Sequence, residues 1–139
     1  CSEQAYFSIK EIDVGLCADV GTLQRLPRLS GHQSLIRELA YTGRKLSAQE
    51  AQRIGLVSGV YSTIEQLDKE ALKLAALIAS KSPIAVVGTK LMLNYSRDHS
   101  IADSLDYVAT WNAAMLQTTD IANSFMASVS KQTPIFSNL

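Results

Sequence analysis

The sequence predicts an α/β fold class in which most of the chain is helical. Residues 5–9 (AYFSI) are aromatic and β-prone, and they read as a short strand. As far as residue 61, strand-like and helix-like segments alternate. From residue 62 onward only helical patterns occur, which predicts four successive helices. We therefore expect two regions, residues 1–61 and residues 62–139.

Three helix starts carry a local signal in the sequence. In a capping box, a Ser hydroxyl accepts the backbone N–H three residues later, and a Glu or Gln there reaches back. Three segments fit this pattern: SGHQ from Ser30, SAQE from Ser47 and STIE from Ser62. The first two helices should end at Gly43 and Gly55, because glycine accepts the left-handed conformation of a helix terminus. Residues 56–61 (LVSGVY) alternate like a further short strand.

The second region has the spacing of amphipathic helices. Apolar side chains recur at 64, 67, 71, 74, 75 and 78, which predicts one buried stripe and one solvated face. Ser82 followed by Pro83 is a typical helix start, and Ser100 and Thr119 are candidate N-caps for the last two helices. These helices carry more large apolar side chains than a short bundle can hide, so self-association is an open alternative to burial in one core. The side chains concerned are Met92, Leu93, Trp111, Met115, Phe125 and Met126.

Composition excludes several classes of function. Thirteen basic and thirteen acidic side chains cancel, and neither sign forms a block, so no nucleic-acid partner is expected. No apolar run approaches the roughly 20 residues of a membrane span. Cys1 and Cys17 have no metal-ligand spacing, and no metal site is predicted. Small molecules or other proteins are the expected partners.

Two acids stand in an otherwise apolar, glycine-containing stretch, residues 11–27 (EIDVGLCADVGTLQRLP). In a straight strand, Glu11 and Asp19 would lie ~26 Å apart, too far to act on one small substrate. Gly15 and Gly21 permit a bend, and a folded-back loop could place the two carboxylates on opposite sides of one apolar pocket. Loss of hydration there makes carboxylates usable as proton donors and acceptors near neutral pH. Capping or simple solvent exposure of the two acids is the alternative.

Longer motifs add a resemblance. The segments KEIDVGLCADVGTLQRLPRLSG and ELAYTGRKLSAQEAQRIGLVSGVY resemble the central to C-terminal part of the crotonase (enoyl-CoA hydratase/isomerase) superfamily. KSPIAVVGTK, NYSRDHS and SLDYVATWNAAMLQT are most similar to its Δ3,5-Δ2,4-dienoyl-CoA isomerases. Hydratases of this superfamily have a Glu at the position of Glu11 and a Gly at the position of Asp19. An acid at both positions is the pattern of the dienoyl isomerases.

The resemblance implies an enzyme that shifts the double bonds of 3,5-dienoyl-CoA to 2,4-dienoyl-CoA in fatty-acid β-oxidation. Glu11 and Asp19 would transfer the protons through a dienolate, and Leu16 would line the acyl pocket. Coenzyme A would be part of the fatty acyl-CoA substrate, with no separate cofactor, and the residues that hold it are not identified.

The resemblance also implies an architecture. Residues 1–61 would end a spiral of ββα turns, and residues 62–139 would be a helical region that forms trimers, often paired into hexamers. Because the chain begins with Cys1, we expect it to be part of a longer polypeptide. The N-terminal half of the same enzyme would supply the oxyanion hole, without which this fragment should be inactive or nearly so. The expected compartment is peroxisomal or mitochondrial, and Ser137, Asn138 and Leu139 weakly resemble a peroxisomal address.

Two other functions stay open. The chain could belong to an enoyl-CoA hydratase or another crotonase in which Asp19 is incidental, or it could be a non-catalytic helical oligomerisation fragment. The remaining chemically versatile side chains have ordinary explanations as caps, surface groups or packing residues. They are His32, His99, Arg25, Arg28, Lys90, Lys131 and Cys17.

Overall fold

A computed structural model describes residues 1–137. The chain divides into two compact units, Cys1–Ala71 and Leu72–Leu139. Helix α4 (Ile64–Ala79) runs across the division. The predicted boundary at residue 61 stays a prediction.

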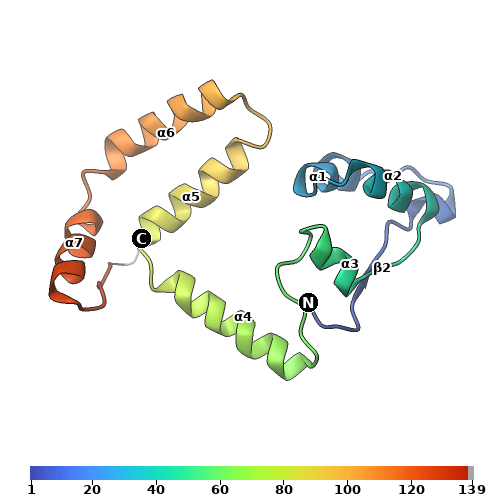
Figure 1. The fold of residues 1–139 in the computed structure, drawn as a ribbon. Helices are drawn as coiled ribbons and strands as arrows, with labels where there is room; N and C mark the ends of the chain where they lie inside the picture. The colour runs from blue at the N-terminus through green and yellow to red at the C-terminus, as the bar shows by residue number, and fades with distance from the viewer. Residues whose placement is uncertain (138–139) are drawn as a thin grey trace. The chain divides into compact units, whose positions relative to one another are not determined.

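The first unit contains short elements joined by tight turns (Figure 1). In chain order they are β1 (Tyr6–Phe7), the 3-10 helix η1 (Glu11–Val14), α1 (Thr22–Leu29), α2 (Gln33–Thr42), β2 (Leu46–Ser47) and α3 (Ala48–Arg53). β1 and β2 pair antiparallel, with Phe7 opposite Leu46. A single parallel bridge joins Ser2 to Tyr61. The α/β class with helix predominating is confirmed.

The core of this unit forms around Leu46, which is only 2% exposed. Ile36 and Leu39 from α2 and Ala51 from α3 pack in the same cluster, together with Ile9 from the segment after β1. Burial of such side chains is the main stabilising term for a unit of this size. Helix α2 thus turns one face to the core, as its apolar spacing requires.

Several local predictions for the first unit are confirmed. Ser47 starts α3 with a complete capping box, its hydroxyl accepting from the Glu50 N–H while the Glu50 carboxylate accepts from the Ser47 N–H. Gly43 ends α2 in the left-handed conformation (φ 59°). Gly55 (φ 75°) follows the end of α3.

Other predictions were wrong. α2 begins at Gln33 rather than directly after Ser30, whose hydroxyl accepts from the His32 N–H and not from the Gln33 N–H that a capping box would require. Thr63, not Ser62, caps α4 by accepting the Gln66 N–H. Residues 56–61 form no strand beyond the Tyr61 bridge to Ser2, because no strand among residues 1–137 lies along them.

The second unit consists of helices (Figure 1). After α4 come α5 (Pro83–Tyr95), α6 (Ile101–Met115) and α7 (Asp120–Ser130), so the four predicted helices are present. Ser82 and Ser100 cap α5 and α6 by accepting N–H groups three residues on. α7 begins directly after Thr119, but among the described residues the Thr119 hydroxyl makes no capping hydrogen bond.

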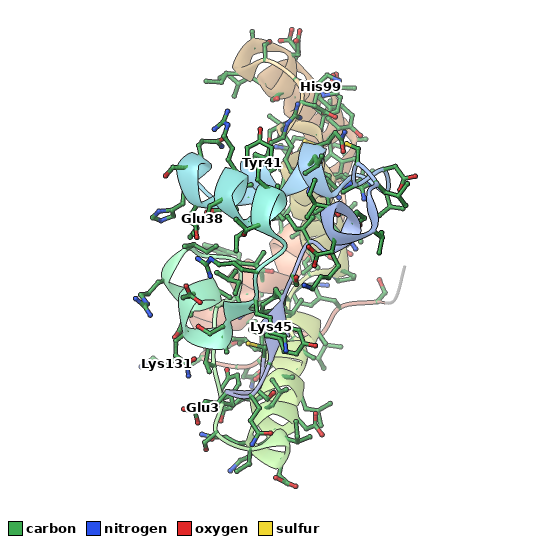
Figure 2. All side chains as sticks on the ribbon, turned by 90° about the vertical axis from the view of Figure 1, so that its right-hand side faces the viewer. Glu3, Glu38, Tyr41, Lys45, His99 and Lys131 are labelled. Atoms are coloured by element: carbon green, nitrogen blue, oxygen red, sulfur yellow. The ribbon has the colours of Figure 1, made fainter. Side chains whose placement is uncertain are left out.

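α5 and α6 pack against each other at Gly88, where the Trp111 ring occupies the space that a side chain would need. The buried Asp120 at the start of α7 accepts from the Ser82 hydroxyl at 2.5 Å, joining the N-terminal ends of α5 and α7. At the α5–α6 turn His99 stacks on Tyr95 at 3.6 Å between ring centres, and Figure 2 shows its side chain. These contacts hold the helical unit together.

Large apolar side chains on these helices remain exposed. Ile64, Leu74 and Ile78 of α4 are 56%, 53% and 46% exposed, so most of the stripe that was expected to be buried is open in the structure. On α7, Ile121, Phe125 and Val129 recur every four residues and are all more than half exposed. Met92, Trp111 and Met115 are half-buried instead. Some of the large apolar side chains noted in the sequence therefore pack between helices, and the others lie on the surface.

Within the described residues, no single helix is long and apolar enough to span a membrane. One pair, α4 with α5, meets the criteria only jointly and is bent by 107° at its break. No group of three or more His, Cys, Asp or Glu side chains able to hold a metal occurs between residues 1 and 137.

Candidate functional site

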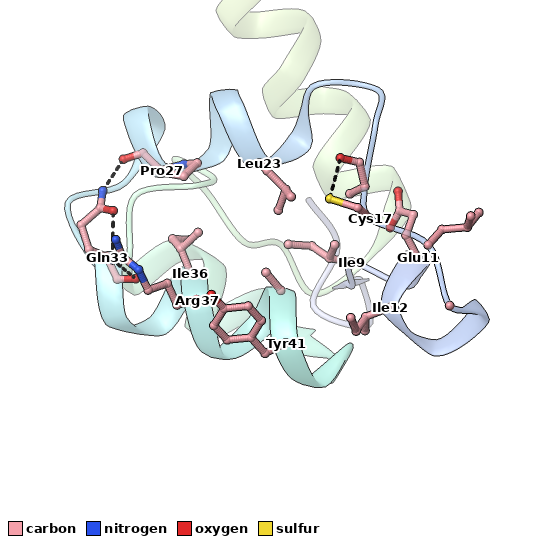
Figure 3. Close-up of a pocket in the computed structure, with 14 residues that line it drawn as sticks. Ile9, Glu11, Ile12, Cys17, Leu23, Pro27, Gln33, Ile36, Arg37 and Tyr41 are labelled. Atoms are coloured by element: carbon pink, nitrogen blue, oxygen red, sulfur yellow. Dashed lines mark hydrogen bonds between the residues drawn. The ribbon is translucent and has the colours of Figure 1, made fainter.

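The first unit contains an apolar pocket of about 520 Å³ (Figure 3). Its walls come from the segment around η1, from α1 and from α2. Ile9, Leu23 and Ile36 form apolar parts of the lining. Pockets that bind small molecules are commonly lined in this way, with a few polar groups among apolar side chains.

Glu11 brings a carboxylate to this pocket. It begins η1, is half-buried, and is one of the lining residues. Its backbone carbonyl accepts from the Leu16 N–H at 2.9 Å, and Gly15 (φ 78°) ends the 3-10 turn. No hydrogen bond to the Glu11 carboxylate is found among residues 1–137.

The loop after Gly15 folds back, as the glycine positions predicted. Leu16, Cys17 and Ala18 all line the pocket, and Ala18 is buried. Leu16 is 61% exposed, so it lies at the rim rather than in the interior. The straight-strand arrangement of this segment is thus excluded.

Asp19 differs from the expected arrangement. It is exposed and is not among the residues that line the pocket, although it directly follows the lining residue Ala18. Glu11 thus lines the pocket and Asp19 does not, and their roles as a pair stay a prediction. The chain after Asp19 turns at Gly21 (φ 92°) into α1, and the Arg25 side chain lies against that glycine.

α2 supplies a polar side of the pocket that the sequence reasoning missed. Gln33, Arg37 and Tyr41 line it, and Figure 3 shows Gln33 and Arg37 across the pocket from Glu11. The Gln33 amide donates to the Pro27 carbonyl at 2.8 Å, which ties α2 to α1. The four-residue spacing of these side chains places them on one helix face. That spacing was visible in the sequence, but it does not indicate that this face of α2 lines a pocket.

The clearest electrostatic network lies away from the pocket. Arg44 bonds Glu38 at 2.6 Å and Glu50 at 3.2 Å. Hydrogen bonds from the Ser47 backbone and hydroxyl, followed by the charge of Arg44, lower the pKa of Glu50. The bond to Glu38 raises the pKa of Arg44. Lys45, labelled in Figure 2, lies 3.9 Å from the centre of the Tyr6 ring. The Arg44 ion pairs with Glu38 and Glu50 thus connect α2 to α3 on either side of β2.

A sequence model of the enoyl-CoA hydratase/isomerase family matches residues 1–138. The chain belongs to this family. Its curated relatives include the mitochondrial Delta(3,5)-Delta(2,4)-dienoyl-CoA isomerase of Homo sapiens, 58% identical over 91% of this chain and 39% of that protein. The peroxisomal Delta(3,5)-Delta(2,4)-dienoyl-CoA isomerase of Arabidopsis thaliana is 48% identical over 100% of this chain and 50% of its own length.

Solved structures of the family have the same fold. The enoyl-CoA hydratase of Bacillus anthracis superposes with a TM-score of 0.91 at 32% identity, over 97% of this chain and 52% of that one. The enoyl-CoA hydratase EchA1 of Mycobacterium marinum gives a TM-score of 0.89 at 30% identity, over 97% and 53%. The predicted crotonase-type fold is therefore confirmed. This family member spans about two-fifths to one-half of the length of the relatives that it matches.

Proposed function

We propose that this chain is the C-terminal part of a dienoyl-CoA isomerase that converts 3,5-dienoyl-CoA to 2,4-dienoyl-CoA. One observation carries the proposal: Glu11 lines an apolar pocket, and a second acid, Asp19, follows a lining residue of the same pocket. Relatives 48% and 58% identical bear the name of this isomerase. Their names also support a mitochondrial or peroxisomal location, to which the described residues add nothing because Asn138 and Leu139 lie outside them.

The reaction needs two proton transfers at separated carbons. One carboxylate removes a proton from C2, next to the thioester, and the electrons spread along the conjugated dienolate. The other carboxylate then delivers a proton to C6. General acid–base groups of this kind contribute about 10²- to 10⁴-fold each. Glu11 and Asp19 are the proposed pair, with Leu16 against the acyl chain at the rim.

Coenzyme A enters this reaction as the carrier part of the substrate. No separate cofactor is needed in the proposed chemistry, because both protons move between carbon and carboxylate. The N-terminal half of the same enzyme is the proposed source of the donors that stabilise the enolate oxygen. Loss of one such donor costs about 10²- to 10³-fold in rate, so the isolated fragment should turn over slowly or not at all.

The test compares Glu11→Gln with Asp19→Asn in the complete gene product, by steady-state kinetics on 3,5-dienoyl-CoA and on a 2-enoyl-CoA. The isomerase proposal expects each substitution to lower kcat for isomerisation by about 10²-fold or more. If Asp19→Asn leaves turnover intact while Glu11→Gln abolishes it, the protein is a hydratase or another crotonase. Both substitutions are isosteric, so circular dichroism spectra should match those of the parent.

A further part of the proposal is assembly through the helical unit into a homotrimer or a hexamer. Ile121, Phe125 and Val129 form an exposed apolar stripe on α7, which favours contact with another copy. Light scattering tests this with Phe125→Glu, and Ser124→Glu on a neighbouring face is the matched control. The first should dissociate the assembly and the second should not. A trimer that ignores acyl-CoA would favour the non-catalytic oligomerisation fragment instead.

A further inference from the structure

The segment that carries Glu11 contacts the C-terminal end of α2 on both sides of that residue. Three positions before Glu11, the Ser8 hydroxyl donates to the Gly43 carbonyl at 2.7 Å in a partly buried, long-range hydrogen bond. Two positions after Glu11, the Asp13 carboxylate lies against the Cα side of Gly43. A side-chain carbon built at Gly43 would lie 3.0 Å from both Asp13 carboxylate oxygens.

Lys10 adds to this arrangement from the position before Glu11. Its ammonium bonds the Asp13 carboxylate at 2.6 Å, and the Asp13 N–H donates to the Lys10 carbonyl at 3.0 Å. Both side chains are about half exposed, so this ion pair contributes little stability. It does orient the Asp13 carboxylate on the side of η1 that faces Gly43.

Gly43 has two separate requirements for glycine. Its φ of 59° lies in the left-handed region, and its missing side chain leaves room for Asp13. Gly55 shares only the first, because its φ is 75° and a side chain there would meet nothing within 4 Å. Gly55 is therefore a control that isolates the effect of the close approach of Asp13 to Gly43.

We propose that Gly43, through Ser8 and Asp13, is a positioning residue for Glu11, fixing η1 so that the carboxylate faces the pocket. The expected effect on kcat rests on the proposed function, whereas the role of Gly43 in fixing η1 does not. A displacement of a reacting group by about 1 Å can cost on the order of 10²-fold in rate. Contact at 3.0 Å requires either the Asp13 side chain or the η1 backbone to move by a few tenths of an ångström.

The experiment compares Gly43→Ala with Gly55→Ala in the complete gene product. Both should lose similar stability, because both place alanine at positive φ. Only Gly43→Ala should also lower kcat, by about threefold or more with KM little changed, because the shift is a fraction of 1 Å. The effects of Asp13→Ala and Gly43→Ala on kcat should not add in the double variant, because both substitutions act on the same contact.

A second readout does not depend on activity. Amide hydrogen exchange at Leu16, whose N–H donates to the Glu11 carbonyl, should accelerate in Gly43→Ala and not in Gly55→Ala. Equal exchange and equal kcat in the two variants would overturn the positioning role. If the parent protein fails to isomerise dienoyl-CoA, the proposed function fails, and the exchange result still decides whether Gly43 fixes η1.

Discussion

Gly88→Ala tests the packing of α5 against α6. Gly88 is buried in α5, and a side-chain carbon built there would lie 2.7 Å from the Trp111 Nε1 atom and 3.0 Å from Cε2. These atoms belong to a rigid ring, so the contact cannot be relieved by the far end of a flexible side chain. The helices must separate, or the ring must leave its position.

Two effects of this substitution oppose each other. Alanine is favoured over glycine in a helix interior by about 1 kcal/mol. Overpacking of a close contact costs about 1–3 kcal/mol. Because the approach is far inside normal carbon–nitrogen contact, we take about 2 kcal/mol for the cost, which leaves a net loss of about 1 kcal/mol in the free energy of unfolding.

Urea unfolding measures this loss. Trp111 is the one tryptophan of this sequence, so its fluorescence reports on the contact itself, while circular dichroism reports on the helices. The double variant Gly88→Ala/Trp111→Phe should show a smaller penalty for the alanine than the single variant does, because the smaller ring leaves room. A Gly88→Ala protein about 1 kcal/mol more stable than its parent would contradict this prediction, since helix propensity alone would then govern the position.

Two further predictions concern the first unit. Leu46→Ala should lower the free energy of unfolding by about 2–5 kcal/mol in a urea titration, because Leu46 is 2% exposed in the core and truncation leaves a cavity; a loss below about 1 kcal/mol would contradict the core assignment. Glu50→Gln should reduce the melting temperature at pH 7, and this difference should shrink as the pH is lowered below 4.5. The lowered pKa of Glu50 means that its carboxylate stabilises the fold above the ordinary value of 4.5, and that this contribution disappears as pH falls through the folded value. A difference in melting temperature that does not change as the pH is lowered would show that the charge of Glu50 is not what stabilises α3.

Sequence alone predicted the features that depend on neighbouring residues. Ser47, Ser82 and Ser100 start their helices because a hydroxyl and the N–H three residues on are brought together by the helix itself. The same reasoning misplaced the start of α2. There, Gly31 and His32 extend the turn before the first helical residue.

Elements that depend on distant partners were not predictable in this way. β2 is two residues long and exists because Leu46 lies opposite Phe7, about forty residues earlier in the chain. Helix α1 was missed because Pro27 lies inside it and it begins after Gly21 without a side-chain cap. LVSGVY has strand-like side chains, but only Tyr61 finds a bridge partner.

In the candidate site too, features set by neighbouring residues were predictable and features set by distant residues were not. Glu11 and the folded-back loop followed from residue type and from the position of Gly15. The polar side of the pocket, from α2, could not be predicted in this way. The spacing of Gln33, Arg37 and Tyr41 shows that they share one helix face, but it does not show that this face lines a pocket. The exposure of Asp19 is likewise a property of the folded loop that its spacing from Glu11 does not determine.

The most direct test of the account is hydrogen exchange at C2 of 3,5-dienoyl-CoA in D₂O, followed by NMR with the Glu11→Gln and Asp19→Asn proteins. If two carboxylates divide the proton transfers, one variant should exchange the C2 hydrogen without forming the 2,4-diene, and the other should do neither. Formation of the 2,4-diene by Asp19→Asn at the parent rate would contradict the account.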